Sequence, residues 1–286
     1  MGILFPRRHS NHRRSWLSGC GVRLVIAAVI AGISVFSYLR LRNVNPITGQ
    51  TQYVSLSVQE EIALGLNAAP AMAAQFGGLT QDQELRLKVD DIGNRLVSQS
   101  DASKSEYRFA FHALADPETV NAFALPGGQI FITQGLLSRF TTDGQIAGVL
   151  GHEVGHVIHR HSAEQMAKSQ LLQGLTGAAI IAATDPSNPS TYNSAMVAQL
   201  VAQMINMKYG RDDELEADRW GVKNMAEAGY DPRAMIQVME VLQSASGGSG
   251  QPEFMSTHPD PGRRIEQIKQ AIRDLYPQGV PEGLEP

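Results

Sequence analysis

The longest uncharged apolar stretch of the chain runs from Leu24 to Leu39 and reads LVIAAVIAGISVFSYL. As a helix it would be about 24 Å long, slightly shorter than the hydrocarbon core of a bilayer. Arg23 and Arg40 bracket it, and arginine side chains can extend to the membrane surface from such positions. Because no small-x-small cleavage site follows, the pattern predicts an uncleaved transmembrane signal anchor over residues 24–39. A cleaved signal peptide and a buried core helix are the alternatives.

Positive charge is distributed unevenly around this apolar segment. Only Arg40 and Arg42 closely follow it. The arginines that precede it are Arg7, Arg8, Arg13, Arg14 and Arg23. Because positively charged flanks stay on the cytoplasmic side, we expect residues 1–23 to form a basic cytoplasmic arm. The body is then expected outside the cytoplasm, in the periplasm if the source is bacterial.

Two short patterns in the arm resemble other export signals. LSGC at residues 17–20 resembles a lipoprotein-processing site, but such a site follows its apolar segment, and here the segment comes after Cys20. Arg13-Arg14 resembles a twin-arginine signal, although arginine pairs are common in basic leaders. The signal anchor is therefore favoured, while cleavage of the anchor and lipidation of Cys20 stay open.

Apolar residues in the rest of the chain recur mostly at helical spacing. A capping box at Ser57 and Glu60 predicts where the first helix of the body begins. The predicted helices cover residues 57–69, 80–97, 142–166, 171–183, 195–209, 212–228 and 232–244. Alternating apolar positions predict strands over residues 107–114 and 129–133. The expected fold is therefore mainly α with a small β-sheet, of the α+β class.

The same pattern divides the chain into segments. Residues 40–56 are polar and are expected to be a linker, and residues 57–275 are expected to form one domain, followed by a tail at 276–286. The apolar stretch at 171–183 is too short to span a bilayer, so we expect a core or membrane-facing helix there. SASGGSGQP at residues 244–252 has the composition of a flexible linker.

Composition narrows the class of protein. The chain is 43% hydrophobic and 18% charged, which is typical of a folded protein. Its net charge of −4 includes seven arginines and no acidic residue within residues 1–43, so the body is strongly acidic. We therefore expect no nucleic-acid partner. The single cysteine precludes an intramolecular disulfide.

The strongest chemical motif is His152-Glu153-Val154-Gly155-His156, which has the H-E-x-x-H pattern within a predicted helix. Residues four apart share a face of a helix, so both imidazoles can bind one Zn²⁺ while Glu153 stands beside the metal-bound water. This predicts one zinc ion per chain and a general base that activates water for peptide-bond hydrolysis.

A catalytic zinc site of this kind needs a third protein ligand, and the acidic helix RDDELEADRW supplies candidates. Glu214 is the predicted ligand, and Asp218, four residues later, is expected to accept a hydrogen bond from a ligand imidazole. Glu216 is expected to face the opposite side. Asp212 and Asp213, in the first turn of the helix, are read as structural.

A third histidine ligand is excluded. In the histidine-rich variant of this motif, a glycine and a histidine follow at positions that His159 and Ser162 occupy here. His159 and His161 are therefore expected to be solvated or packing residues.

Four motifs together resemble the zinc metallopeptidase family of HtpX, BepA and the CAAX prenyl endopeptidase. They are GHEVGHVIHRH, the E-x-x-x-D at residues 214–218, NAFALPGGQIFITQGLL at residues 121–137, and STHPDPGRRI at residues 256–265. The resemblance implies a gluzincin-type fold with a small β element beside the active-site helix. It looks closest to the BepA-like bacterial branch, because the HtpX and CAAX branches have several transmembrane spans.

The resemblance also implies roles for further residues. Asn121, Ala122, Gly127 and Gly128 would lie along the cleft, where backbone groups can pair with an extended substrate; a plain hairpin turn is the alternative for the glycines. His258 would be a regulatory fourth ligand, or else an ordinary loop histidine. Arg264 would stabilise the oxyanion.

The expected function is that of a zinc-dependent metalloendopeptidase, attached to the membrane by its N-terminal anchor, acting on polypeptide substrates. Unfolded or misassembled envelope proteins are the expected substrates, which would make it a quality-control enzyme. The alternative is a zinc-containing chaperone or assembly factor with a latent active site. An intact Glu153 favours the enzyme, because a purely structural zinc needs no general base.

Overall fold

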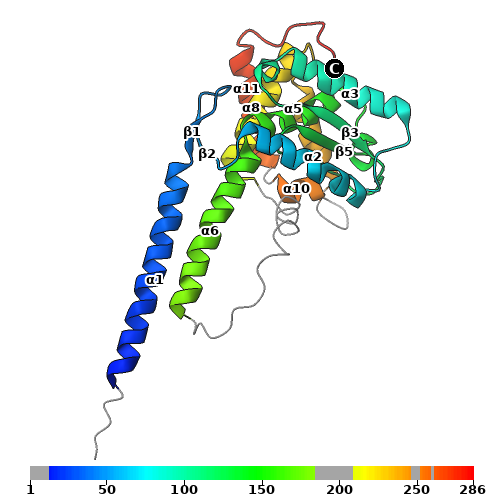
Figure 1. The fold of residues 1–286 in the computed structure, drawn as a ribbon. Helices are drawn as coiled ribbons and strands as arrows, with labels where there is room; N and C mark the ends of the chain where they lie inside the picture. Colours follow the sequence, from blue (N-terminus) through cyan, green and yellow to red (C-terminus); the bar gives the residue numbers. More distant parts are fainter. Residues whose placement is uncertain (1–12, 184–208, 246–251, 259–260) are drawn as a thin grey trace, which may run out of the picture.

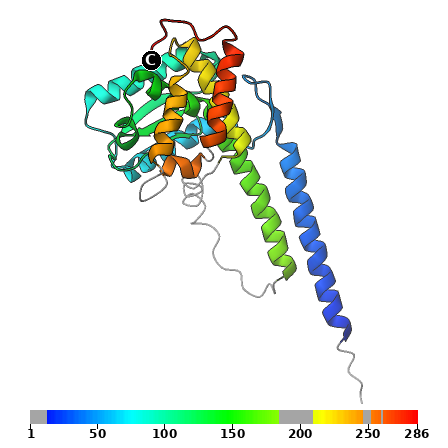
Figure 2. The ribbon, with the colours of Figure 1, turned by 180° about the vertical axis from the view of Figure 1, so that it is seen from behind.

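The computed structural model describes residues 13–183, 209–245, 252–258 and 261–286. Within them the protein is mainly helical with a small sheet, and this confirms the predicted α+β class. Figure 1 shows a body from which two long helices extend together, and Figure 2 shows the same arrangement from behind. The helix predicted over residues 195–209 and the linker at 244–252 lie almost entirely outside the described residues.

The first extending helix is α1 (Arg13–Arg40), which contains the predicted anchor. Its stretch Gly21–Arg40 is long and apolar enough to cross a membrane, with a mean hydropathy of 2.1. The second is α6 (His161–Ala183), which includes the apolar stretch at 171–183. That stretch is therefore the second half of a longer helix that begins in the body.

The predicted linker after α1 is structured. It forms an antiparallel hairpin of β1 (Arg42–Val44) and β2 (Thr51–Tyr53). The Nδ2 group of Asn45 donates to Gln52 Oε1 at 3.1 Å and to the carbonyl oxygen of Ile158 at 2.7 Å. Because Ile158 ends the central helix of the body, the hairpin is fixed to that helix.

A three-stranded sheet lies in the body, in the order β3 (Ala110–Leu114), β5 (Gln129–Thr133) and β4 (Ala122–Leu125). β5 runs parallel to β3 and antiparallel to β4. β3 and β5 fulfil the two strand predictions, whereas β4 was not predicted because it is short and adjoins the Pro126-Gly127-Gly128 turn. That turn requires glycine: Gly127 has φ +82°, and a Cβ there would lie 2.4 Å from Ile62 Cα.

The central helix is α5 (Asp143–Ile158), which is buried along its whole length. A capping box of Thr142 and Gln145 sets its beginning. The prediction of one helix over residues 142–166 is wrong, because Arg160 adopts a left-handed φ of 59° that separates α5 from α6. Its buried guanidinium donates to Glu61 Oε1 at 2.8 Å and to the Leu56 carbonyl at 2.6 Å, which offsets the cost of this backbone geometry.

Helices surround the sheet and α5 and complete the main hydrophobic core, while α2 (Val58–Gln75) packs on the strands in a second, smaller cluster. The predicted capping box begins the first of them, since Glu60 N donates to Ser57 Oγ at 3.3 Å and Ser57 N to Glu60 Oε2 at 2.7 Å. The remaining helical segments are α3 (Gln83–Ser98), the 3-10 helix η1 (Asp101–Lys104), α4 (Gln134–Leu137), α8 (Arg211–Glu227), α9 (Ala234–Ala245), α10 (Glu253–Thr257) and α11 (Pro261–Leu275).

The C-terminal residues contact the body. Asp231 N donates to the Glu285 carbonyl at 2.7 Å, and Gly144 N to the Pro286 carbonyl at 2.9 Å. Glu285 also forms an ion pair with Arg95 at 2.5 Å. These contacts join the last residues to the beginning of α5 and to α3.

Candidate active site

Three predicted site residues lie one turn apart or less on α5. His152 and His156 point the same way from this buried helix, with their Nε2 atoms 3.0 Å apart. Glu153 follows His152 and is completely buried. The close packing of α8 against α5 is possible because glycines and alanine meet there: a Cβ on Gly155 would lie 3.0 Å from Ala217 Cα. This contact brings the acidic residues of α8 to the two histidines.

α8 contributes Glu214 to the same point. Glu214 Oε1 lies 3.5 Å from His156 Nε2, and Oε2 lies 3.5 Å from His152 Nε2. Although burial opposes ionisation, His258 and Arg264 together hold the pKa of Glu214 well below its usual value. The side chain is therefore an ionised carboxylate between the two histidines.

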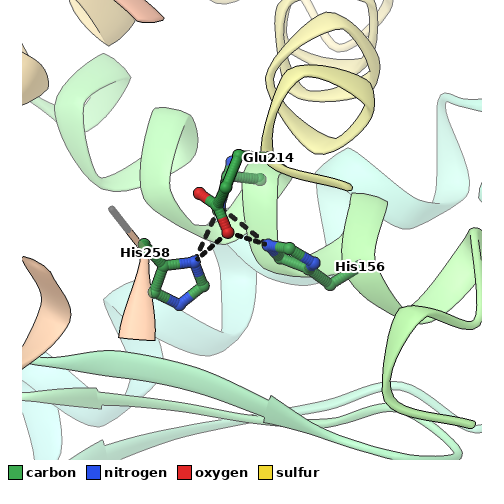
Figure 3. Close-up of side chains that lie close together, drawn as sticks. His156, Glu214 and His258 are labelled. Atoms are coloured by element: carbon green, nitrogen blue, oxygen red, sulfur yellow. Dashed lines mark hydrogen bonds and ion pairs between the residues drawn. The ribbon is translucent and has the colours of Figure 1, made fainter. Parts of the chain in front are cut away.

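His258 approaches from the end of α10, as Figure 3 shows. Its Nδ1 atom lies 2.9 Å from Glu214 Oε1 and 3.3 Å from His152 Nε2. Phe254 stacks on the ring at a centroid distance of 4.3 Å. His258 is thus buried inside the cluster.

These donor atoms suit a metal ion. A tetrahedral ion with bonds of ~2.0–2.1 Å needs donors about 3.3 Å apart. The closest separations among His152, His156, Glu214 and His258 lie between 2.9 and 3.5 Å. Glu214 Oε2 is buried and accepts no hydrogen bond within the described part of the chain, and its contact there is an ion pair with Arg264 Nη1 at 2.8 Å. A buried, ionised carboxylate whose two oxygens each face an imidazole nitrogen is the donor set of a divalent cation.

Glu153 lies beside this donor set and does not belong to it. Neither carboxylate oxygen has a hydrogen-bond partner among the described residues, and His258 Nε2 lies 3.6 Å from Glu153 Oε1. Burial raises the pKa of Glu153. A carboxylate with a raised pKa and free lone pairs has the properties of a general base.

Asp218 and Arg264 form a second layer behind the metal-binding atoms. Asp218 Oδ1 lies 2.8 Å from His152 Nδ1. Arg264 donates to both carboxylate oxygens of Asp218, at 2.7 and 2.6 Å, and its Nη1 lies 2.8 Å from Glu214 Oε2. Arg264 therefore holds two carboxylates of α8 and is itself only 2% exposed.

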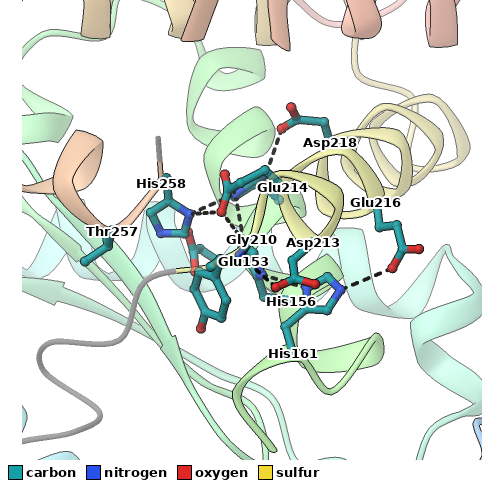
Figure 4. Close-up of polar contacts among 12 residues, drawn as sticks. Glu153, His156, His161, Gly210, Asp213, Glu214, Glu216, Asp218, Thr257 and His258 are labelled. Atoms are coloured by element: carbon teal, nitrogen blue, oxygen red, sulfur yellow. Dashed lines mark hydrogen bonds and ion pairs between the residues drawn. The ribbon is translucent and has the colours of Figure 1, made fainter. Parts of the chain in front are cut away.

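His156, the second predicted ligand, has a partner that sequence reasoning missed. His156 Nδ1 lies 2.8 Å from His161 Nδ1, and His161 Nε2 lies 3.3 Å from Glu216 Oε2 (Figure 4). Glu216 also lies 3.3 Å from His159 Nδ1. Glu216 does face away from the metal-binding atoms, but it is connected to them through His161. The sequence offers only the spacing of His156 and His161 in HVIHRH as a sign of this contact. Residues five apart do not share a face of a regular helix, and the two meet here because the helix breaks at Arg160.

Tyr209 is a further residue that the sequence did not single out. Its ring stacks on His156 at a centroid distance of 3.9 Å, and its hydroxyl lies 2.9 Å from Ser162 Oγ. The stack covers one face of the metal-binding ring and keeps water from it.

A small cavity of about 40 Å³ adjoins the cluster and is lined by His258, Tyr209, Asn121 and residues of β4. This volume holds a few water molecules but no extended peptide. Of the predicted substrate-binding residues, Asn121 lines the cavity and has an unpaired, buried Oδ1, while Ala122 is buried at the start of β4. Gly127 lies against α2 and Gly128 against Arg108 and Phe109, and neither lines the cavity.

Comparison with known proteins agrees with this geometry. The model of peptidase family M48 matches residues 83–272, which include the residues of the cluster. A β-barrel assembly-enhancing protease from Yersinia pestis is 28% identical over 89% of this chain and 52% of its own length. The mitochondrial metalloendopeptidase OMA1 of Schizosaccharomyces pombe is 30% identical over 86% of this chain and 71% of its own length.

The human mitochondrial metalloendopeptidase OMA1 is similar to a comparable degree, with 31% identity over 83% of this chain and 47% of its own length. The chain thus spans about half the length of the bacterial and human relatives.

Proposed function

This chain belongs to peptidase family M48, a family of metal-dependent peptidases, and from that premise we propose that it is a zinc-dependent metalloendopeptidase. The observation that carries the proposal is the meeting of His152, His156 and Glu214 beside the unpaired carboxylate of Glu153. Three N and O donors with an adjacent free carboxylate are the site composition of a hydrolytic zinc centre.

His152, His156 and Glu214 would hold one Zn²⁺, which when bound polarises the scissile carbonyl and lowers the pKa of a coordinated water. Glu153 accepts the proton of the attacking water and later delivers it to the leaving amine. Asp218 orients His152 through the contact at Nδ1, and burial of all these groups keeps bulk water from the reacting atoms.

Arg264 is proposed to fix this geometry by binding Asp218 and Glu214 at once. The oxyanion role that the family resemblance implies for Arg264 uses the same guanidinium. Both hydrogen bonds to Asp218 come from Nε and Nη2, and Nη1, which makes no hydrogen bond among the described residues, is the donor left for a substrate oxygen. Positioning and oxyanion stabilisation are therefore compatible.

We propose extended polypeptides as substrates, bound by addition to β4. Among the described residues β4 pairs only with β5, so its other edge is open to a substrate strand beside Asn121 and the cavity. A strand can be added only by a segment without other backbone pairing. Unfolded or misassembled envelope proteins supply such segments, and a relative from Yersinia pestis is named a β-barrel assembly-enhancing protease.

We further propose that His258 is a regulatory fourth ligand that keeps the site closed. Its Nδ1 occupies the position near Glu214 and His152 that a catalytic centre leaves open for water. Opening requires that α10 withdraw His258, and the glycine-serine segment at residues 244–252 precedes it in the sequence. The closed arrangement is also the observation that favours the alternative function, a chaperone or assembly factor with a latent site.

The proposed location is a membrane, with the N-terminus in the cytoplasm and the body outside it. The candidate span Gly21–Arg40 and the arginine excess before it support this orientation.

The deciding experiment compares the full-length protein with Glu153→Gln and His258→Ala, purified in detergent, for zinc content and for hydrolysis of unfolded casein. We expect one zinc per chain in all three, hydrolysis that is lost by at least 10²-fold in Glu153→Gln, and faster hydrolysis in His258→Ala. Bound zinc without hydrolysis by any variant would replace the protease with the chaperone function. Hydrolysis that persists in Glu153→Gln would refute the assigned base.

A further inference from the structure

The second half of α6 lies beside the candidate membrane span. α6 leaves the body next to the end of α1 and runs antiparallel to it in both views (Figures 1 and 2). The two helices approach closely at Gly174, where a Cβ would lie 2.3 Å from Ser34 Oγ. Ser34 lies within the stretch Gly21–Arg40, so Gly174 is at the depth of that stretch.

On the side nearer the body, the last charged residues of the two helices lie at the same height along the helix pair. Lys168 precedes Gly174 by as many residues as Arg40 follows Ser34, so these two cations lie at similar heights. Lys168 pairs with Glu164 at 3.6 Å, on the side nearer the body. From Ser169 to Ala183, α6 has no charged residue. Tyr38 and Tyr53 stack at this level, at 4.9 Å, where aromatic residues mark a membrane interface.

Below this level both helices present apolar side chains outward. Leu172 on α6 is 62% exposed, and Val29, Ile33 and Phe36 on α1 are 54%, 60% and 62% exposed. The exposed polar residues of α6 here, Gln173 and Thr176, are uncharged, and Ser34 Oγ donates to the Ile30 carbonyl at 2.9 Å within its own helix. A surface of this kind is stable in lipid and unfavourable in water.

We propose that α6 from Ser169 to Ala183 is embedded in the same bilayer as α1. The segment is about 22 Å long at 1.5 Å per residue, so it enters from the side of the body and ends short of the opposite surface. Contacts between small residues, Gly174 and Ser34 above all, are the usual means by which helices associate in lipid. The inference rests on the proposed anchor, because the depth of α6 in the bilayer is inferred from its position beside α1.

This embedding identifies the substrate class more closely. α6 begins at His161, one residue after the Arg160 joint with α5, and the interface level at Lys168 is about 10 Å further along the helix. The active site is therefore held near the membrane surface. Its substrates are polypeptide segments that lie beside a bilayer, such as the flanks of membrane-inserted proteins.

The test places a lipid-sensitive probe on each helix. In the full-length Cys20→Ser protein, single cysteines replace Leu172 on α6, Val29 on α1 and Leu87 on α3, residues of comparable exposure at 62%, 54% and 54%. Each is labelled with NBD and reconstituted into phosphatidylcholine vesicles with or without bromine on the acyl chains. We expect brominated lipid to reduce the emission of the Leu172→Cys and Val29→Cys proteins at least twofold and to leave Leu87→Cys unchanged.

Quenching of Val29→Cys without Leu172→Cys would overturn the proposal while leaving the anchor in place. A Leu172→Cys probe that iodide in water and brominated lipid both fail to quench would also overturn it, since protein would then cover α6. If brominated lipid quenches neither the Leu172→Cys nor the Val29→Cys probe, the proposed membrane anchor would be refuted as well. The result is independent of hydrolysis, so failure here and failure of the proposed peptidase activity are distinguishable.

Discussion

The two histidines that we propose bind the metal are oriented by different partners. His152 has Asp218 at its Nδ1, whereas His156 has a histidine, His161. Burial holds the pKa of His156 well below its usual value, so its ring is neutral. If Nε2 of His156 binds the metal, its proton would lie on Nδ1 and be donated to His161 Nδ1, and the His161 proton would then lie on Nε2 and point to Glu216.

We predict that removing this chain of hydrogen bonds weakens metal binding. His161→Ala should raise the dissociation constant for zinc by about 10- to 100-fold, because His156 loses the acceptor that fixes its tautomer. Glu216→Gln should have a smaller effect in the same direction. Competition with a chromogenic chelator measures both.

Glu227→Gln, on the same helix but in a surface ion pair with Lys223, is the matched control and should leave zinc affinity unchanged. An unaltered affinity in His161→Ala would contradict the role. His159, His161 and Glu216 could together hold a second metal ion. Two zinc ions per chain would therefore contradict the proton assignment, because His161 Nε2 cannot both carry a proton and bind an ion.

At the scale of elements, the site depends on how closely α5 and α8 approach. Gly155 meets Ala217, and Gly151 meets Gly221, where a Cβ would lie 3.4 Å from the Gly221 Cα. Small residues at this crossing bring Glu214 to the two histidines. Helix packing and metal binding therefore depend on the same residues.

Gly155→Val should destabilise the protein by about 1–3 kcal/mol and lower its zinc affinity, because the added methyl groups push α8 away. Gly177→Val in α6 is the matched control, since nothing lies within 4 Å of its Cβ position. Thermal unfolding in detergent and zinc titration provide the measurements. Equal losses of stability and zinc affinity in the two variants would show that the low helix propensity of valine, and not the contact between α5 and α8, causes the effect.

The joint between α5 and α6 gives a second prediction at this scale. Arg160→Ala should destabilise the protein by about 3–5 kcal/mol, because it leaves Glu61 buried without its partner. Arg233→Ala, which removes a largely exposed ion pair with Asp231, should cost less than about 1 kcal/mol. Similar shifts of the unfolding midpoint for the two variants would show that the Arg160 ion pair is not important.

Some of these elements could be predicted from the sequence and others could not. The capping box at Ser57, the strand at 129–133 and the face shared by His152 and His156 follow from local spacing, which a single chain segment determines. The break at Arg160 depends on Glu61, a residue far away in the sequence, and the partner of His161 depends on that break. Local patterns carry no information about such contacts.

At the scale of the whole molecule, the metal would join three separate parts of the chain: α5, α8 and the end of α10. Binding to the folded state alone stabilises it, so removal of zinc with a chelator should lower the unfolding midpoint by on the order of 10 °C. The Glu153→Gln protein should show the same decrease on zinc removal, because it retains all the proposed zinc ligands. Added zinc should restore the unfolding midpoint of both proteins. An unchanged midpoint after verified zinc loss would mean that the three parts meet without the metal.

The Arg160 joint has a consequence for which bond is cut. It connects the helix of the proposed metal site to the helix that we propose lies in the bilayer. The catalytic centre would then stay about 10 Å above the lipid, a distance that corresponds to roughly three residues of extended chain. For a substrate anchored in the same membrane, distance from the bilayer would then select the cleavage point, and the amino-acid sequence around that point would matter less.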